Sequence, residues 1–95
     1  MRKADQVDLH VAEQLRRRRR LLNLAQREVA VVCGVRFQQI QKYEAGATRI
    51  SAGRLWQLAE ALDVPVAYFF EGLQRHEAAN QVVDPQPPAP RRRNA

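Results

Sequence analysis

Cysteine, glycine and long apolar runs are scarce in this sequence of 95 residues. The single cysteine, Cys33, excludes an intrachain disulfide, and no Cys/His spacing resembles a metal site. No stretch approaches about 18 consecutive apolar residues, and the N-terminus lacks the charged-then-apolar pattern of a secretory signal. We therefore expect a soluble, cytoplasmic protein that binds no metal or other cofactor and has no membrane segment.

Groups of residues that would support catalysis are missing as well. The sequence contains no Ser/His/Asp, Cys/His or paired-carboxylate arrangement and no Gly-rich phosphate loop. His10 and His76 are isolated, and Cys33 is expected to be a small buried hydrophobic residue rather than a redox switch. These absences predict that the protein is not an enzyme.

Positive charge is present in excess and is unevenly distributed. The chain has 16 Lys and Arg against 10 Asp and Glu, which gives a net charge of +6. The excess lies in residues 1–24, which include the arginine run 16–20, and in the three arginines at 91–93, whereas residues 25–90 are nearly balanced. A basic patch on a balanced body is typical of proteins that bind a polyanion such as nucleic acid.

The spacing of apolar residues and of helix-terminating residues predicts an all-α protein with five helices. Asp8 begins the first helix and Ser51 caps the fourth, whereas Asn23, Gly34 and Gly46 follow helix ends. Pro65 fits the first turn of a short fifth helix. The expected helices are 8–22, 26–33, 37–45, a segment from Ser51 to residue 62, and 65–70.

The chain divides into one domain with two flexible ends. Residues 1–6 are polar and are expected to form a flexible N-terminus, followed by a helical domain over residues 7–74. Residues 75–95 lose helical periodicity and contain four prolines before Arg91, Arg92 and Arg93, which predicts a disordered tail. The arginines at its end serve either to solubilise the chain or to add non-specific phosphate contacts.

The stretch from Gln26 to Gly46 is the most informative part of the sequence. Two helices that cross through a short turn need a small residue where they approach, which Ala30 supplies, and a residue with positive φ in the turn, which Gly34 supplies. Ile40 and Tyr43 then point inward from the second helix of the pair. The shared core is expected to consist of Val29, Cys33, Val35, Ile40 and Tyr43. This spacing predicts a helix-turn-helix motif formed by the second and third helices.

The other face of the third helix is polar except for one aromatic residue. It is expected to present Phe37, Gln38, Gln41 and Lys42. Glutamine can pair with adenine, lysine can donate to guanine, and phenylalanine can touch the methyl group of thymine. Such a face suits the major groove of double-stranded DNA, while the start of the second helix can hold a phosphate.

Residues 11–73 resemble the XRE family of helix-turn-helix regulators, the type of Cro and the phage repressors. The resemblance rests on residues 37–46, on Arg49-Ile50-Ser51 and on residues 64–70, which look like an alphaproteobacterial subgroup. It implies a five-helix, lambda-repressor-like DNA-binding domain. It also implies that a homodimer binds a palindromic operator and regulates transcription.

The resemblance further implies a role for individual residues. Base recognition falls on Phe37, Gln38 and Lys42, with Arg36 and Gln41 in reach. It pairs Arg19 with Glu44 in an ion pair that braces the first helix against the third. Phosphate contacts are expected at Arg19, Gln26, Thr48 and Arg49, to which we add Arg17 from the arginine run.

Two positions depart from the family pattern. The family usually has Ser or Thr before Gln26 and at position 36, where this chain has Ala25 and Arg36. Each change removes a helix cap, which is worth on the order of 1 kcal/mol. The second helix is therefore expected to fray more than in relatives, and Arg36 adds a positive charge beside the groove.

Two questions stay open from the sequence. Trp56, Phe70 and Leu73 belong either to the core or to a dimer interface. The function has one alternative, an antitoxin-like or other interaction protein that regulates its own operon and holds a protein partner through the C-terminal tail.

Overall fold

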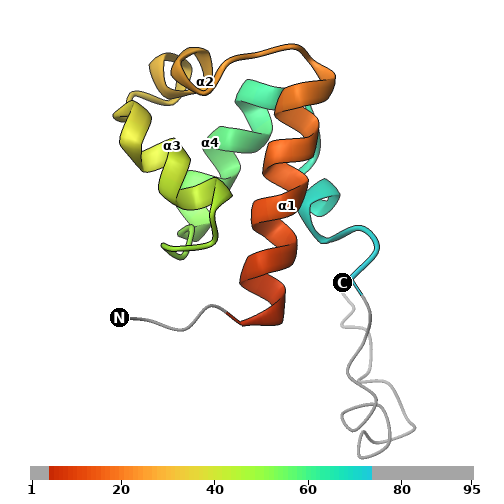
Figure 1. The fold of residues 1–95 in the computed structure, drawn as a ribbon. Coiled ribbons are helices and arrows are strands. Elements are labelled where there is room, and N and C mark those ends of the chain that lie inside the picture. Colours follow the sequence, from red (N-terminus) through yellow and green to blue (C-terminus); the bar gives the residue numbers. More distant parts are fainter. Residues whose placement is uncertain (1–4, 74–95) are drawn as a thin grey trace, which may run out of the picture.

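Residues 5–73, the part of the chain that the computed structural model describes, form four α-helices and one 3-10 segment without any strand. The helices are α1 (Gln6–Leu21), α2 (Gln26–Cys33), α3 (Phe37–Glu44) and α4 (Ala52–Leu62), followed by the 3-10 segment η1 (Val66–Phe70). α1 packs against α3, α4 and η1, and α2 packs against α3 and α4 (Figure 1). The predicted all-α class is confirmed. The tail at 75–95, together with the partner role assigned to it, lies outside the described residues.

The first helix begins earlier than the sequence predicted. Asp5, not Asp8, is the N-cap, and its side chain accepts a hydrogen bond of 2.8 Å from the backbone N–H of Asp8. The helix therefore includes Gln6, which was expected to be part of a flexible end, and it stops at Leu21. Both aspartates satisfy helix-start rules, since an acidic residue is favourable either as cap or in the first turn.

The expected fifth helix is a 3-10 segment instead. Tyr68 donates its backbone N–H to the carbonyl of Pro65 at 2.9 Å, which is the i to i+3 pattern of a 3-10 turn. The segment has only five residues, and β-branched and aromatic residues favour helix weakly. Its conformation is set by Phe69, which is fully buried in the core.

Side chains from all five elements build one core. The fully buried side chains are Leu15, Val29, Ile40, Leu58, Leu62 and Phe69. Cys33 is buried among them as expected, and desolvation raises the pKa of its thiol although Arg54 lowers it by a smaller amount. Val35, expected in the same core, is only partly buried at its edge.

Polar side chains of α1 also tie the helices together. Arg18 donates from Nε to the carbonyl of Leu62 at 2.9 Å and from Nη2 to that of Asp63 at 3.3 Å, so it satisfies the last carbonyls of α4. Gln14 is buried and donates to the carbonyl of Tyr68 at 3.1 Å, which fixes η1 against α1. These contacts hold the first helix in a defined position relative to the helix pair α2 and α3.

Candidate nucleic-acid interface

A tight turn joins α2 to α3. Gly34 ends α2 with a φ of 69°, and the N–H of Val35 donates to the carbonyl of Ala30 at 3.0 Å. Ala30 is 3% exposed, and its small side chain allows the two helices to approach each other closely. The structure therefore contains a helix-turn-helix arrangement at the residues for which the sequence predicted it.

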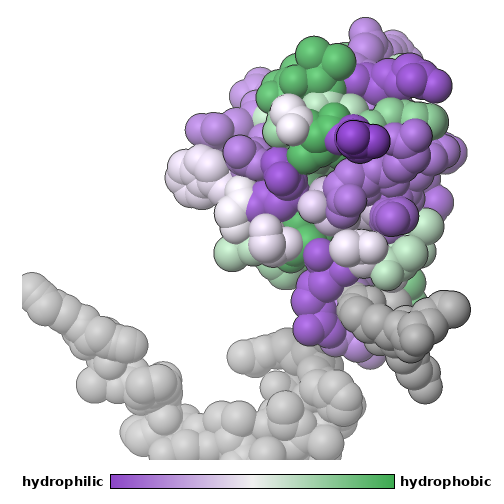
Figure 2. All heavy atoms as spheres, turned by 90° about the vertical axis from the view of Figure 1, so that its left-hand side faces the viewer, coloured by the Kyte–Doolittle hydropathy of each residue, from purple (hydrophilic) through white to green (hydrophobic). Residues whose placement is uncertain are grey.

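The outward face of α3 is polar and accessible. Gln38, Gln41 and Lys42 are exposed, as is Arg36 at the N-cap, whereas Ile40 on the opposite face is fully buried. Within residues 5–73, the side chains of Gln38, Gln41 and Lys42 make no hydrogen bond or ion pair. Figure 2, which views the molecule from the α3 side, shows mainly hydrophilic residues, with the most extensive apolar area at the top, toward the end formed by α2. The face can therefore offer amide and ammonium groups to a ligand.

Phe37 does not share this outward position. Its side chain is half-buried and packs against the core cluster, and the guanidinium of Arg27 lies 4.2 Å from the centre of its ring. The predicted contact of Phe37 with a base is thus not supported by its placement. The outward direction expected for Phe37 was wrong, because the first residue of a helix can fold back toward the preceding helix, and its contact with a base stays a prediction.

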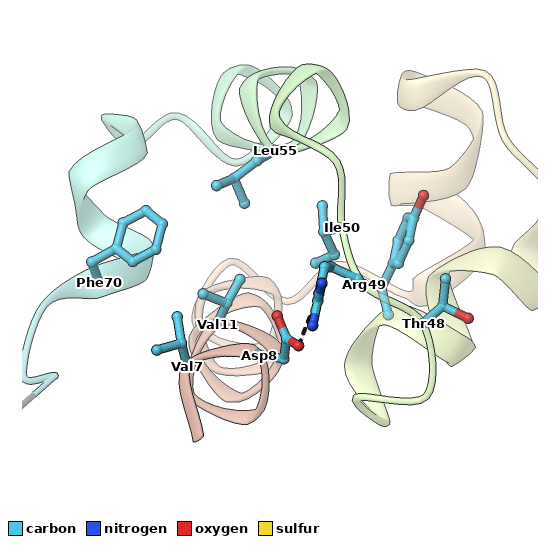
Figure 3. Close-up of a pocket in the computed structure, with 9 residues that line it drawn as sticks. Val7, Asp8, Val11, Thr48, Arg49, Ile50, Leu55 and Phe70 are labelled. Carbon is cyan, nitrogen blue, oxygen red and sulfur yellow. Dashed lines mark hydrogen bonds and ion pairs between the residues drawn. The ribbon is translucent and has the colours of Figure 1, made fainter. Parts of the chain in front are cut away.

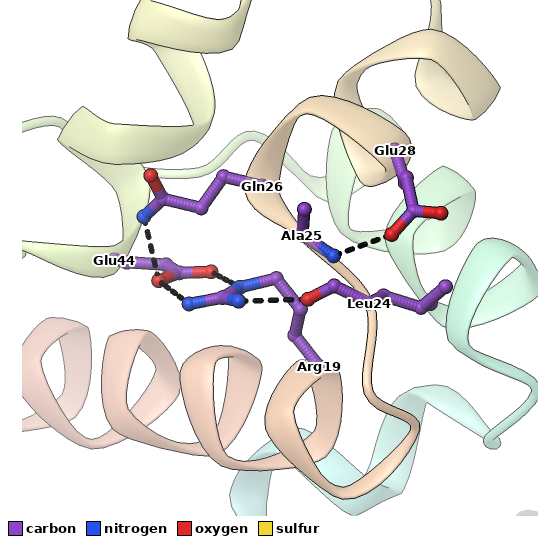
Figure 4. A network of polar contacts seen from close by, with 6 residues as sticks. All are labelled: Arg19, Leu24, Ala25, Gln26, Glu28 and Glu44. Carbon is purple, nitrogen blue, oxygen red and sulfur yellow. Dashed lines mark hydrogen bonds and ion pairs between the residues drawn. The ribbon is translucent and has the colours of Figure 1, made fainter.

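A buried ion pair joins α1 to the end of α3 (Figure 4). Arg19 donates from Nε to Glu44 Oε2 at 2.6 Å and from Nη2 to Oε1 at 2.9 Å. The two side chains are only 12% and 4% exposed, and the hydrogen bond to Glu44 raises the pKa of Arg19. Two parallel charge-assisted hydrogen bonds fix direction as well as distance. The pair therefore braces α3 against α1, as the family resemblance implied.

The same network changes the expectation for two phosphate contacts. The third guanidinium nitrogen of Arg19, Nη1, donates to the carbonyl of Leu24 at 2.8 Å, so every nitrogen has an acceptor inside the protein. The amide of Gln26 donates to Glu44 Oε1 at 2.9 Å. Arg19 and Gln26 thus both donate to the carboxylate of Glu44. Arg19 therefore has the bracing role that was expected of it, and the phosphate contacts of Arg19 and Gln26 stay predictions.

The start of α2 lacks a side-chain cap, as the alanine predicted. The methyl group of Ala25 cannot accept a hydrogen bond from the backbone of α2. The backbone N–H of Ala25 nevertheless donates to Glu28 Oε1 at 2.6 Å (Figure 4). One half of a capping box is thus present, and the half that would protect the N–H groups of the helix is absent. The bond between Ala25 and Glu28 therefore limits the expected fraying of α2, although the missing cap does not.

Restoring the missing cap is expected to stabilise the protein. Ala25 already has the extended backbone of an N-cap, with φ of −79° and ψ of 156°, so Ala25→Ser should add a capping bond without strain. We expect a gain of about 1 kcal/mol in the free energy of unfolding, measured by urea denaturation. Ala25→Val, which offers no acceptor, is the control and should give no gain; equal midpoints for the serine and valine variants would contradict the prediction.

The loop after α3 carries the other predicted phosphate contacts, Thr48 and Arg49. Arg49 is exposed, yet its Nε donates to Asp8 Oδ2 at 3.1 Å and its Nη2 lies 3.8 Å from Asp5 Oδ2. Thr48, Arg49 and Asp8 line a small pocket of about 140 Å³ between α1 and this loop (Figure 3). An acidic pair from the start of α1 thus partly neutralises the arginine that was expected to hold a phosphate.

Removing this carboxylate is expected to strengthen DNA binding. In Asp8→Asn the Arg49 guanidinium loses a competing anion, and ion pairs made by a solvent-exposed arginine at the surface are worth about 0.2–1 kcal/mol. Affinity for duplex DNA should rise by up to about fivefold for every sequence alike, as measured by fluorescence anisotropy. In an Arg49→Gln background the same change should have a smaller effect. A fall in affinity would instead mean that Asp8 positions Arg49 for DNA.

Arg17 lies away from α3. It is exposed, and it lines one shallow depression with Arg16 and Arg20 and another with Gln14 and Tyr68 beside η1. The arginine run therefore divides, because Arg18 and Arg19 bond inward while the other three face solvent. A phosphate contact at Arg17 stays a prediction.

Three apolar residues remain at the surface where a dimer interface was predicted. Trp56 is 61% exposed on α4 and Phe70 is 39% exposed at the end of η1, while Leu73 is half-buried. Phe70 reaches the pocket of Figure 3 together with Val7 and Leu55. The core therefore does not account for Trp56 and Phe70, and their role in a dimer stays a prediction.

Other kinds of site are not found in the described part of the chain. No group of three or more His, Cys, Asp or Glu residues within residues 5–73 is arranged to hold a metal ion. None of the helices in that range has the length and hydropathy needed to span a bilayer.

Comparison with known proteins agrees with the geometry. The model of the helix-turn-helix family HTH_3 matches residues 15–69. The chain is 55% identical over 69 residues to an uncharacterized transcriptional regulator in the ATPase CF(0) region of Rhodospirillum rubrum, covering 73% of this chain. It spans 64% of that relative's length and 50% of another curated relative's length.

Solved structures show the same similarity. The restriction-modification controller protein C.AhdI from Aeromonas hydrophila is 26% identical with a TM-score of 0.63, and the match covers 65% of this chain and 94% of that one. The DNA-binding domain of the P22 c2 repressor is 27% identical with the same TM-score of 0.63, over 65% and 82% of the two chains. The chain belongs to the HTH_3, XRE-type family of helix-turn-helix DNA-binding transcriptional regulators.

Proposed function

We propose that this protein regulates transcription as a homodimer that binds a palindromic operator, with α3 of each subunit in the major groove. The observation that carries the proposal is the outward face of α3. Gln38, Gln41 and Lys42 are exposed there, and their side chains make no hydrogen bond or ion pair within residues 5–73. Amide and ammonium groups of this kind distinguish adenine and guanine from the other bases.

Rigidity of the helix supports the same proposal. Base recognition requires side chains that are held within a fraction of an ångström, so the helix that carries them must not rotate. Ile40 anchors α3 in the core, and the bidentate bond from Arg19 holds its last residue, Glu44. The polar face is thus presented by a helix that is fixed on its opposite side.

Contacts to the DNA backbone would come from elements beside α3. The N–H groups at the start of α2 have no side-chain cap and are available to a phosphate, as helix N-termini commonly are. Thr48 and Arg49 lie in the loop that follows α3. Two elements next to α3 therefore carry groups that favour an anion, and we propose that these groups hold the DNA backbone beside the groove.

The proposal also includes the formation of a dimer. Trp56 and Phe70 expose large apolar surfaces, and in helix-turn-helix dimers the two recognition helices lie about 34 Å apart, one turn of DNA. We propose that Trp56 and Phe70 contribute to the contact with the second subunit. Trp56→Gln should then lower the dimer fraction in sedimentation equilibrium while leaving the helical circular dichroism unchanged.

Selection of binding sites from random double-stranded DNA tests the function directly. The full chain at a stated salt concentration is expected to enrich a palindromic consensus whose half-sites are one helical turn apart. Enrichment of a single asymmetric half-site would overturn the homodimer. A pool without any enriched sequence would overturn sequence-specific binding itself.

A further inference from the structure

The contact between Arg27 and Phe37 joins the two helices of the helix-turn-helix at the ends expected to face DNA. Arg27 is the second residue of α2 and is exposed, and Phe37 is the first residue of α3. The guanidinium carbon lies 4.2 Å from the centre of the ring, which is within the range of a cation–π interaction. The ring thus holds the arginine side chain in one place on the surface.

The contact with the ring leaves the hydrogen-bonding groups of the guanidinium unused. The face of an aromatic ring attracts the positive charge but does not replace the hydrogen-bond acceptors that the five N–H groups can bind. Within residues 5–73, the side chain of Arg27 makes no hydrogen bond or ion pair besides the ring contact. By contrast, Arg18, Arg19 and Arg54 all donate to acceptors inside the protein. The charge of Arg27 is therefore both positioned and available.

The place of Arg27 is not explained by the stability of its own helix. A positive side chain in the first turn is disfavoured by the helix dipole, which attracts an anion to that end. In α2 that end carries Glu28 in the ordinary acidic role, with Arg27 beside it. An approaching phosphate would be attracted by the free N–H groups and by Arg27 together, because both are positive.

We infer that Arg27 is a phosphate-contacting residue of the DNA interface and that Phe37 is the positioning residue that holds it. This inference rests on the proposed function and deepens it. Arg27 is assigned to the backbone because the first helix of a helix-turn-helix crosses the backbone while the second enters the groove. Phe37 then acts through Arg27 and does not contact a base.

The test uses the full chain and a 20-base-pair duplex of random sequence, so that no operator needs to be known. Anisotropy titrations over a series of KCl concentrations give the affinity and the slope of log K against log salt. Arg27→Gln is expected to weaken binding about tenfold and to reduce the slope by about 0.9, the value for one lost phosphate contact. Phe37→Leu is expected to weaken binding about threefold, since exposed cation–π contacts are modest.

Two matched variants separate positioning from a merely structural role. Phe37→Tyr keeps the ring and should bind like the wild type, whereas Phe37→Leu in the Arg27→Gln background should cause no further loss. Unchanged affinity and slope in Arg27→Gln would overturn the inference, as would equal losses from Phe37→Leu in both backgrounds. Failure of the wild-type chain to bind DNA at all would instead overturn the proposed function.

Discussion

Glu44→Ala is expected to lower the melting temperature by more than about 10 °C. Glu44 is 6% exposed and accepts three hydrogen bonds, two from Arg19 and one from Gln26. Removing one partner of a buried ion pair costs about 3–5 kcal/mol because the other charge stays buried without compensation. In a domain of this size each kcal/mol corresponds to about 4–8 °C. Thermal denaturation followed by circular dichroism measures the change.

A matched substitution at the surface serves as the control. Glu60 is exposed on α4 and its side chain makes no hydrogen bond or ion pair within residues 5–73, so Glu60→Ala should change stability by less than about 0.5 kcal/mol. Replacing both members, as in Arg19→Met with Glu44→Leu, should be less damaging than Glu44→Ala alone, since no unpaired charge remains. Similar melting temperatures for Glu44→Ala and Glu60→Ala would show that the pair does not brace the fold.

Arg19 does not change its charge near neutral pH, so its titration does not make the ion pair with Glu44 sensitive to pH there. The hydrogen bond to Glu44 raises the folded-state pKa of Arg19 above its ordinary value. A cation with a raised pKa contributes stability that is fully present below the unfolded-state value and is lost only as the pH rises through the folded-state value. Between pH 6 and pH 9, the titration of Arg19 should therefore leave the melting temperature unchanged.

Local signals in the sequence predicted most of the fold. The bounds of α2 follow from Gln26 and Gly34, and Ser51 caps α4 with a bond of 3.1 Å to Arg54 N. Errors arose where two residues satisfy the same rule, as at the start of α1, or where burial outweighs propensity, as in η1. In η1 the burial of Phe69 fixes the backbone, and burial is a property of the whole fold rather than of five residues.

Side-chain contacts between helices were harder to predict than the helices themselves. Arg19 and Glu44 are separated by 25 positions and could be paired only through the family resemblance. Arg49 and Asp8 are 41 positions apart, and neither the spacing nor the charge pattern indicated that they meet. The stacking of Arg27 on Phe37 was missed for the same reason, because it depends on the helix crossing and on rotamers. A weak signal existed, since Arg27 is a positive residue at a helix N-terminus.

The Lys42→Ala variant is expected to bind its preferred operator about 10–100-fold more weakly and to lose preference at one base position in each half-site. Lys42 is exposed on the outward face of α3, where an ammonium group can donate to guanine. Loss of a base contact costs about 1–3 kcal/mol of binding free energy on the preferred operator, and little on operators that lack the recognised base pair. The measurement is a set of titrations at constant salt against operators that each carry a single base-pair change.

Two further variants distinguish a base contact at Lys42 from a backbone contact. Lys42→Arg should retain the preference, because arginine also recognises guanine, whereas Arg49→Ala should weaken all operators alike without changing their order. A uniform loss across the operators in Lys42→Ala would place Lys42 on a phosphate. Base recognition by α3 would then depend on Gln38 and Gln41, which share its exposed face and can each pair with adenine.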